Sequence, residues 1–119
     1  MNSKTYPATQ PAEEQERRYP AAQLRAQIVA VLQAWGMSAA HAEVTARLMV
    51  QTDLLGVDSH GISMLPHYDR LRGKGLVVAA EPVRVRRFGA TSLWDGRAGL
   101  GHPVAHAAMQ DAISQARLH

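Results

Sequence analysis

The chain has 119 residues, enough for one small domain with a single hydrophobic core. Hydrophobic residues make up 46% of the sequence, charged residues 19% and aromatic residues 5%, so we expect a globular protein whose core is mainly aliphatic. The net charge of +3 indicates neither a nucleic-acid-binding nor a membrane-binding protein. The chain has no cysteine, which excludes disulfides and thiolate metal sites, and it has neither a signal peptide nor an apolar run near the roughly 18 residues of a membrane helix. We therefore expect a cytoplasmic location.

The first part of the chain predicts a leader and two helices. Residues 1–19 are rich in charge and proline and nearly free of apolar side chains, so we predict a disordered leader. A first helix should open at Pro20 and stop at Gly36, because five apolar residues recur on one helical face. These residues are Leu24, Ile28, Val31, Leu32 and Trp35. Ser38 is a good N-cap for a second helix that should stop at Gly56. Its predicted apolar face contains Ala40, Val44, Leu48 and Leu55.

A third helix is predicted over residues 60–72, with Asp58 or Ser59 as its cap. Three of its apolar residues share a helical face, namely Met64, Tyr68 and Leu71. Pro66 lies in its second turn and should bend or shorten it. Together the three helices form a predicted helical segment, residues 20–75.

A βα segment is predicted over residues 82–119. Alternating valines and arginines after Pro82 indicate a short strand, and a turn at residues 89–91 leads to a second one. A glycine-rich loop, residues 95–101, then precedes a helix that Pro103 opens. The apolar stripe of that helix comprises Ala105, Met109, Ala112, Ile113 and Ala116. The predicted fold class is α+β. Because the stripe still runs at the last residue and a strand pair alone is marginal in water, we expect residues 20–119 to be the amino-terminal part of a longer protein.

The strongest candidate site is the pair Ser59 and His60, which lies between two glycines where two predicted helices meet. A histidine can move a proton at neutral pH, and a neighbouring hydroxyl can orient its ring, so the pair suits acid/base chemistry on a carbonyl or an alcohol. The alternative is that Ser59 caps a helix and His60 is an ordinary first-turn residue. Spacing alone favours that alternative.

Three other candidates carry weaker signals. The loop from Gly99 to Gly101 is a poor match to a dinucleotide-binding turn, and a plain turn braced by Asp95 is the better interpretation. His102 and His106 could share a helical face as zinc ligands do, but no third ligand completes the site. Tyr68, taken alone, is typical of a core aromatic.

The stretch from Asp53 to Tyr68, with its Asp-Leu-x-Gly-Val-x-Ser-His-Gly-Ile core, resembles the malate/L-lactate dehydrogenase family. The later Asp-Gly-x-x-Gly-x-Gly loop and the alanine-rich helix after it support the resemblance, which covers about residues 20–119. It implies a non-Rossmann fold, a homodimer, and reversible hydride transfer between NAD or NADP and a small 2-oxo or 2-hydroxy acid. By the same resemblance His60 would be the proton donor and acceptor, Ser59 would act in a relay with it, and Tyr68 would line the substrate pocket.

Two departures from the family pattern stand out. Many members carry an arginine three residues after the Ser-His-Gly glycine, suited to a substrate carboxylate, and here that position is Met64. The Gly-Ile-x-Met-Leu-Pro-x-Tyr pattern is similar to the hydroxycarboxylate dehydrogenase branch, in which an apolar residue at this position would admit a bulkier substrate. The second departure is length, since family members continue through a further histidine motif and most of the cofactor site. We therefore expect the isolated chain to be inactive.

The alternative from another class is a small helical binding module, with nucleic acid as a candidate ligand, because three short helices with a basic balance superficially fit a helix-turn-helix. Against it, the third predicted helix begins with Ile62, Met64, Leu65 and Pro66, which are not the polar side chains that contact bases. We therefore expect a small-molecule substrate and neither a nucleic-acid nor a membrane partner.

Overall fold

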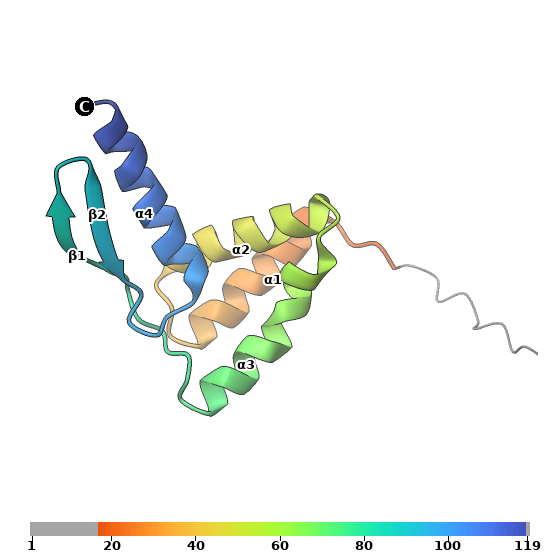
Figure 1. The fold of residues 1–119 in the computed structure, drawn as a ribbon. Coiled ribbons are helices and arrows are strands. Elements are labelled where there is room, and N and C mark those ends of the chain that lie inside the picture. Colours follow the sequence, from red (N-terminus) through yellow and green to blue (C-terminus); the bar gives the residue numbers. More distant parts are fainter. Residues whose placement is uncertain (1–16, 119) are drawn as a thin grey trace, which may run out of the picture.

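A computed structural model describes residues 17–118 (Figure 1). Of the predicted leader, residues 1–16 lie outside the described part, and residues 17–19 are exposed and belong to no helix or strand. The secondary structure elements are, in chain order, α1 (Ala21–Ala34), α2 (Ala39–Leu54), two 3-10 turns η1 (Asp58–His60) and η2 (Ile62–Met64), α3 (Leu65–Gly73), β1 (Val83–Phe88), β2 (Thr91–Asp95) and α4 (Gly101–Ala116). The predicted α+β class is confirmed. No helix within residues 17–118 is long and apolar enough to span a bilayer.

Helices α1 and α2 lie against one another and form the core (Figure 1). The first helix is confirmed, although Pro20 is its N-cap and not its first residue. Ile28 and Leu32 are fully buried, as the apolar face of α1 predicts. The Ser38 cap is also confirmed, because its hydroxyl accepts a hydrogen bond from the backbone N–H of His41 at 3.4 Å. Local sequence signals were therefore sufficient for this helix pair.

The prediction of which face of α2 is buried was wrong. The residues that α2 buries are Ala42, Thr45, Ala46, Met49 and Val50. Ala40 and Leu55 are exposed, and Val44 and Leu48 are only half-buried. The buried face therefore holds the large side chains Met49 and Val50 together with small ones, and it is rotated relative to the predicted face.

The third helix was predicted to begin too early. The chain instead makes the turns η1 and η2, and α3 begins only at Leu65. Pro66 then lies in the first turn of α3, where a missing backbone N–H leaves no hydrogen bond unmade. Neither Asp58 nor Ser59 caps α3, because its N-cap residue is Met64. Helix α3 is thus shorter than predicted, and Pro66 lies at its start and not in its second turn.

The predicted strand pair is confirmed as an antiparallel hairpin, in which Val83 lies opposite Asp95 and Phe88 lies opposite Thr91. An irregularity at residue 85 interrupts the register. The hairpin is joined to α4 through Asp111, whose carboxylate accepts hydrogen bonds from Arg84 at 3.1 Å and Arg87 at 2.7 Å. A hydrogen bond from Ser92 is the largest cause of a lowered pKa at Asp111, and the two arginines lower this pKa further. Asp111 therefore stays ionised and joins α4 to β1 through these ion pairs.

Helix α4 buries a face different from its apolar stripe. It begins at Gly101, with Pro103 in its first turn, and its buried residues are Pro103 and Gln115. Met109 and Ile113 of the stripe are 59% and 40% exposed. The stripe is a surface feature of the described chain, because α4 turns its other side to α2 and β2.

The α1–α2 core predicts a simple pattern of stability. Replacing Leu32 with Ala should lower the free energy of unfolding by about 2–5 kcal/mol, because a fully buried side chain is lost and a cavity remains. Leu54→Ala is the matched control: this leucine is 73% exposed, and its loss should change the stability by less than about 0.5 kcal/mol. Urea unfolding followed by circular dichroism measures both variants, and equal losses would contradict this core.

Candidate active site

The candidate site is held by a contact between α2 and the turn that follows it. The Asp53 carboxylate accepts a hydrogen bond from the backbone N–H of Ile62 at 2.9 Å, which joins residues nine positions apart. A side chain at Gly61 would collide with this carboxylate, since a Cβ there would lie 1.6 Å from Asp53 Oδ1. The φ angle of Gly61 is −93°, which other residues also adopt. The space left by Asp53 therefore requires glycine at this position.

This contact shapes the turn that presents Ser59 and His60. The two residues belong to η1, and the backbone N–H of His60 donates to the carbonyl of Val57 at 3.0 Å. The Ser59 hydroxyl lies 2.8 Å from His60 Nδ1, and both residues are exposed. Ser59 thus contacts the imidazole and does not cap a helix. The interpretation that spacing alone favoured is wrong, and the side-chain pair that the chemistry asks for is present.

The hydrogen bond fixes how the imidazole can exchange a proton. With Nδ1 engaged by Ser59, the ring nitrogen that remains for another molecule is Nε2, which makes no hydrogen bond to any residue in the 17–118 range. When Nδ1–H donates to Ser59 Oγ, Nε2 can release or accept a proton without a change at Nδ1. The arrangement is therefore suited to general acid and base chemistry.

Met64 and Tyr68, the other predicted site residues, are partly buried against the α1–α2 core. Burial raises the pKa of the Tyr68 phenol, so the hydroxyl keeps its proton at neutral pH. The structure places Met64 at the N-cap of α3 and Tyr68 one turn into the helix. Both residues follow the turn that carries His60.

The structure adds His102, which the sequence did not single out for this region. Its ring lies 6.2 Å from the Tyr68 ring, centroid to centroid, in an edge-on arrangement at 83°. Burial lowers the pKa of His102, and its Nδ1 is buried with no hydrogen-bond partner among the residues described. His102 lies 34 positions from Tyr68 and on another helix, so no local pattern could have indicated the contact.

The glycine-rich loop folds onto its own chain. Asp95 Oδ1 accepts a hydrogen bond from the backbone N–H of Arg97 at 2.8 Å, as the expected bracing role requires. A Cβ at Gly99 would lie 2.9 Å from the carbonyl oxygen of Ala80, so Gly99 serves close packing of the chain. The loop therefore offers no open cradle for a dinucleotide phosphate. Across residues 17–118, no group of three His, Asp or Glu residues could hold a metal ion.

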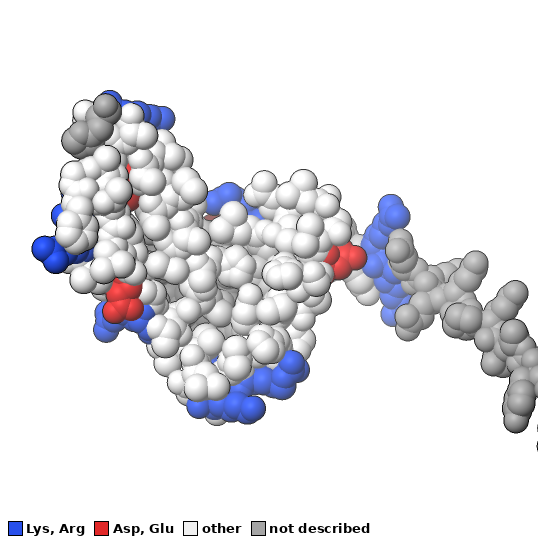
Figure 2. All heavy atoms as spheres, in the orientation of Figure 1, with Lys and Arg blue, Asp and Glu red and all other residues white. Residues whose placement is uncertain are grey.

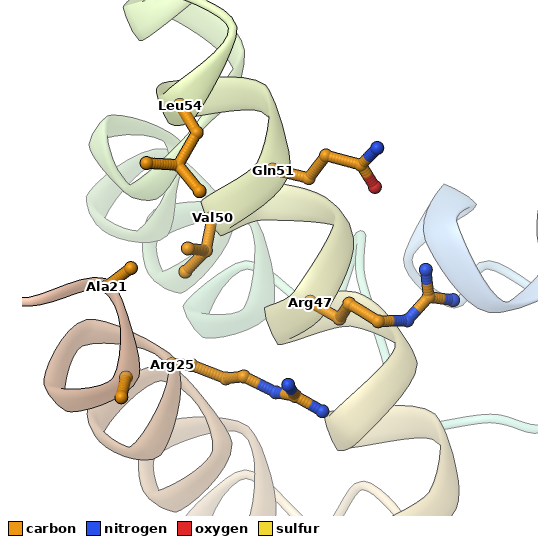
Figure 3. Close-up of a pocket in the computed structure, with 7 residues that line it drawn as sticks. Ala21, Arg25, Arg47, Val50, Gln51 and Leu54 are labelled. Carbon is orange, nitrogen blue, oxygen red and sulfur yellow. The ribbon is translucent and has the colours of Figure 1, made fainter.

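A separate groove lies between α1 and α2 (Figure 3). Arg25 and Arg47 extend from the two helices in the same direction, and Arg25 is paired with Glu43. The floor of the groove consists of apolar residues, namely Ala21, Ala22, Val50 and Leu54. It contains no group that exchanges protons near neutral pH, so it is a poorer candidate for acid and base chemistry than the Ser59–His60 turn.

The structure does not support the helix-turn-helix alternative, because the predicted recognition residues do not form an exposed surface. Ile62, Met64 and Leu65, which would have to face a DNA groove, pack against the core. On the face drawn in Figure 2, the Lys and Arg side chains form separate groups and no continuous basic stripe. Neither feature fits a DNA-reading helix.

The chain is an α+β protein whose η1 turn presents an imidazole in contact with a hydroxyl, an arrangement suited to acid and base chemistry. Comparison with known proteins identifies it further. Residues 19–119 match the family described as malate/L-lactate dehydrogenase, and the chain belongs to this family.

Relatives within the family support the assignment. The chain is 39% identical over 89 residues to the (2R)-3-sulfolactate dehydrogenase (NADP(+)) of Chromohalobacter salexigens, a match covering 75% of this chain and 27% of the relative. It is 34% identical over 107 residues to hydroxycarboxylate dehydrogenase B of Escherichia coli, covering 89% and 30%. The chain thus spans less than a third of the length of these relatives.

Solved structures agree. A putative malate/lactate dehydrogenase from E. coli superposes with a TM-score of 0.81 at 33% identity, covering 87% of this chain and 29% of that one. The sulfolactate dehydrogenase of Methanocaldococcus jannaschii gives a TM-score of 0.78 at 33% identity, covering 82% and 28%. The fold described above is therefore the fold of the corresponding segment in this family.

The Asp53–Gly61 contact predicts a local sensitivity to small side chains. Gly61→Ala should lower the free energy of unfolding by about 1–3 kcal/mol, because the new methyl group displaces the Asp53 carboxylate and leaves the Ile62 N–H without its partner. Gly73→Ala is the control, since nothing lies within 4 Å of a Cβ at that position. Thermal unfolding compares the two, and a neutral Gly61→Ala would disprove the steric argument.

His102 predicts a pH dependence of stability. Burial keeps the folded ring neutral at pH values where the unfolded chain, with a histidine pKa of about 6.5, already binds a proton. The free energy of unfolding should therefore fall as the pH drops below about 6.5, and His102→Phe should weaken that fall. Urea unfolding at a series of pH values measures the difference between the two proteins, and parallel curves would contradict the prediction.

Proposed function

We propose that this chain is the amino-terminal, proton-handling part of an NAD(P)-dependent dehydrogenase that interconverts a small 2-oxo acid and its 2-hydroxy acid by hydride transfer. The observation that carries the proposal is the 2.8 Å contact between the Ser59 hydroxyl and His60 Nδ1, on a turn of a chain that belongs to the malate/L-lactate dehydrogenase family. Relatives named as sulfolactate and hydroxycarboxylate dehydrogenases support this class of substrate.

His60 has the proton-transfer role in this proposal. Reduction of a carbonyl leaves negative charge on its oxygen, and protonated His60 gives that oxygen the proton from Nε2. The ring is then neutral, with Nδ1–H still donated to Ser59 Oγ. In the oxidation direction the same Nε2 takes the hydroxyl proton back. With Nδ1–H donated to Ser59 Oγ in both protonation states, the proton is exchanged at Nε2 alone.

Tyr68 and Met64 have substrate-binding roles in this proposal. The Tyr68 hydroxyl keeps its proton, so it can donate a hydrogen bond to a substrate oxygen over the whole neutral range. Met64 supplies a flexible apolar surface, which suits a 2-oxo acid whose side chain is larger than a methyl group.

The cofactor, NAD or NADP, is part of the proposal for the whole enzyme. The glycine-rich loop packs against its own backbone at Gly99, so it is not proposed as a phosphate cradle. We assign the proton and substrate contacts to this chain and leave the cofactor-binding residues unassigned. We further propose that the whole enzyme is a homodimer and acts in the cytoplasm.

The proposal is tested in the dehydrogenase that contains this chain. His60→Ala should lower kcat with a 2-oxo acid and NAD(P)H by a factor of about 10²–10⁴ while the circular dichroism spectrum stays unchanged, because the proton donor is lost. Ser59→Ala keeps the imidazole and should cost less. His67→Ala, which removes an exposed histidine of α3, is the control with little expected effect. A wild-type rate in the His60 variant would mean that the proton comes from another group.

A further inference from the structure

The Tyr68 ring is one point at which the helical segment meets the start of α4. Tyr68 comes from α3, and His102 comes from the first turn of α4, immediately after the glycine-rich loop. Their rings lie 6.2 Å apart and nearly perpendicular, at 83°. Perpendicular, edge-on contact is a favoured arrangement of two aromatic rings, because the positive edge of one faces the negative face of the other.

The contact is one of packing and carries no charge. His102 Nδ1 has no hydrogen-bond partner in the described chain, so no polar bond from this atom holds the imidazole in place. Burial favours the neutral form of both rings, raising the pKa of Tyr68 and lowering that of His102. An uncharged ring that is fixed by its neighbours can set the direction of the phenol without changing its protonation.

Tyr68 has a second aromatic neighbour, His67, which differs from His102 in its exposure and in its place in the fold. The ring of His67 lies 6.1 Å from that of Tyr68, at a tilt of 58°. His67 is exposed, precedes Tyr68 in the same helix and contacts Arg70. It can follow any movement of α3, so it cannot hold Tyr68 relative to the rest of the fold. His102 can, because it is anchored beside buried residues Leu100 and Pro103.

We propose that His102 is a positioning residue for Tyr68: its ring packs edge-on against the phenol and fixes the direction in which the Tyr68 hydroxyl faces the substrate. This inference rests on the proposed function for its catalytic consequence, because it assigns α4 a part in substrate binding. The ring contact itself can be tested without any turnover.

The first test follows the ionisation of Tyr68 in this chain. With Tyr6→Phe and Tyr19→Phe in place, Tyr68 is the only remaining phenol, and its absorbance at about 295 nm should titrate above the ordinary tyrosine value of about 10. His102→Ala should shift the midpoint back toward that value, since the phenol loses its cover. His102→Phe, which keeps the ring, and His67→Ala should leave the midpoint raised. Circular dichroism at each pH confirms that the fold is intact.

Two results of this titration would overturn the inference. One is an unchanged midpoint in His102→Ala, which would mean that other groups bury Tyr68. The other is an equal shift in His102→Phe and His102→Ala, which would mean that ring packing does not hold the phenol. His102→Phe should also be at least as stable as the wild type, because it removes a buried nitrogen that has no hydrogen-bond partner.

The second test measures catalysis in the dehydrogenase that contains this chain. His102→Ala should lower kcat/KM for a 2-oxo acid by roughly tenfold to a hundredfold, as expected for a misplaced binding group, and His102→Phe should restore most of it. His67→Ala should match the wild type. Loss of activity in His102→Phe equal to that in His102→Ala would assign His102 a polar role of its own and overturn positioning. An inactive wild type would refute the proposed function, whereas the titration would still decide the ring contact.

Discussion

The candidate site depends on one partly buried hydrogen bond, from the backbone N–H of Ile62 to the carboxylate of Asp53. It joins the last turn of α2 to the turn that precedes α3, and it leaves room for only a hydrogen atom at Gly61. A backbone N–H bonded to a charged acceptor is worth more than a neutral pair, so the turn has a strong preference for this geometry. The Ser-His-Gly sequence is therefore a structural unit: glycine makes room for Asp53, and the resulting 3-10 turn presents the serine and the histidine together.

The position of the turn that carries His60 depends on the helix pair α1 and α2. Asp53 belongs to α2, which shares the hydrophobic core with Ile28 and Leu32 of α1. At the other end of α3, the Arg72 guanidinium lies 5.2 Å from the centre of the Trp35 ring, which ties that end to α1. The segment that carries His60, Met64 and Tyr68 is thus attached to the core at both ends.

The sequence predicted those parts of the fold that depend on neighbours close in the chain. Helix α1, the Ser38 cap and the hairpin follow from apolar periodicity, capping chemistry and alternation. The beginning of α3 could not be predicted in this way, because Asp53 reaches over nine residues and replaces a helical turn with two 3-10 turns. The buried face of α2 was misplaced for a related reason. The contact with α1 buries Ala42 and Ala46 together with Met49, and the apolar spacing of α2 alone did not show which face would meet α1.

The two parts of the candidate site differ in the same way: one contact joins neighbours in the chain, and the other joins residues far apart in it. Ser59 and His60 are adjacent in the chain, so their chemistry could be recognised from the sequence, while the choice between a helix cap and a side-chain pair needed the turn geometry. The contact between Tyr68 and His102 depends on how α4 is placed, and that placement rests on the βα segment, in which Asp111 binds two arginines of β1. Asp111 is nearly enclosed, with 9% of its side chain exposed, and a carboxylate removed from water requires its cationic partners. If His102 positions Tyr68 as we propose, this ion-pair group lies within the same structural unit as the substrate contact. Changes in the hairpin would then reach the phenol through α4, although the hairpin carries no residue of the proposed chemistry.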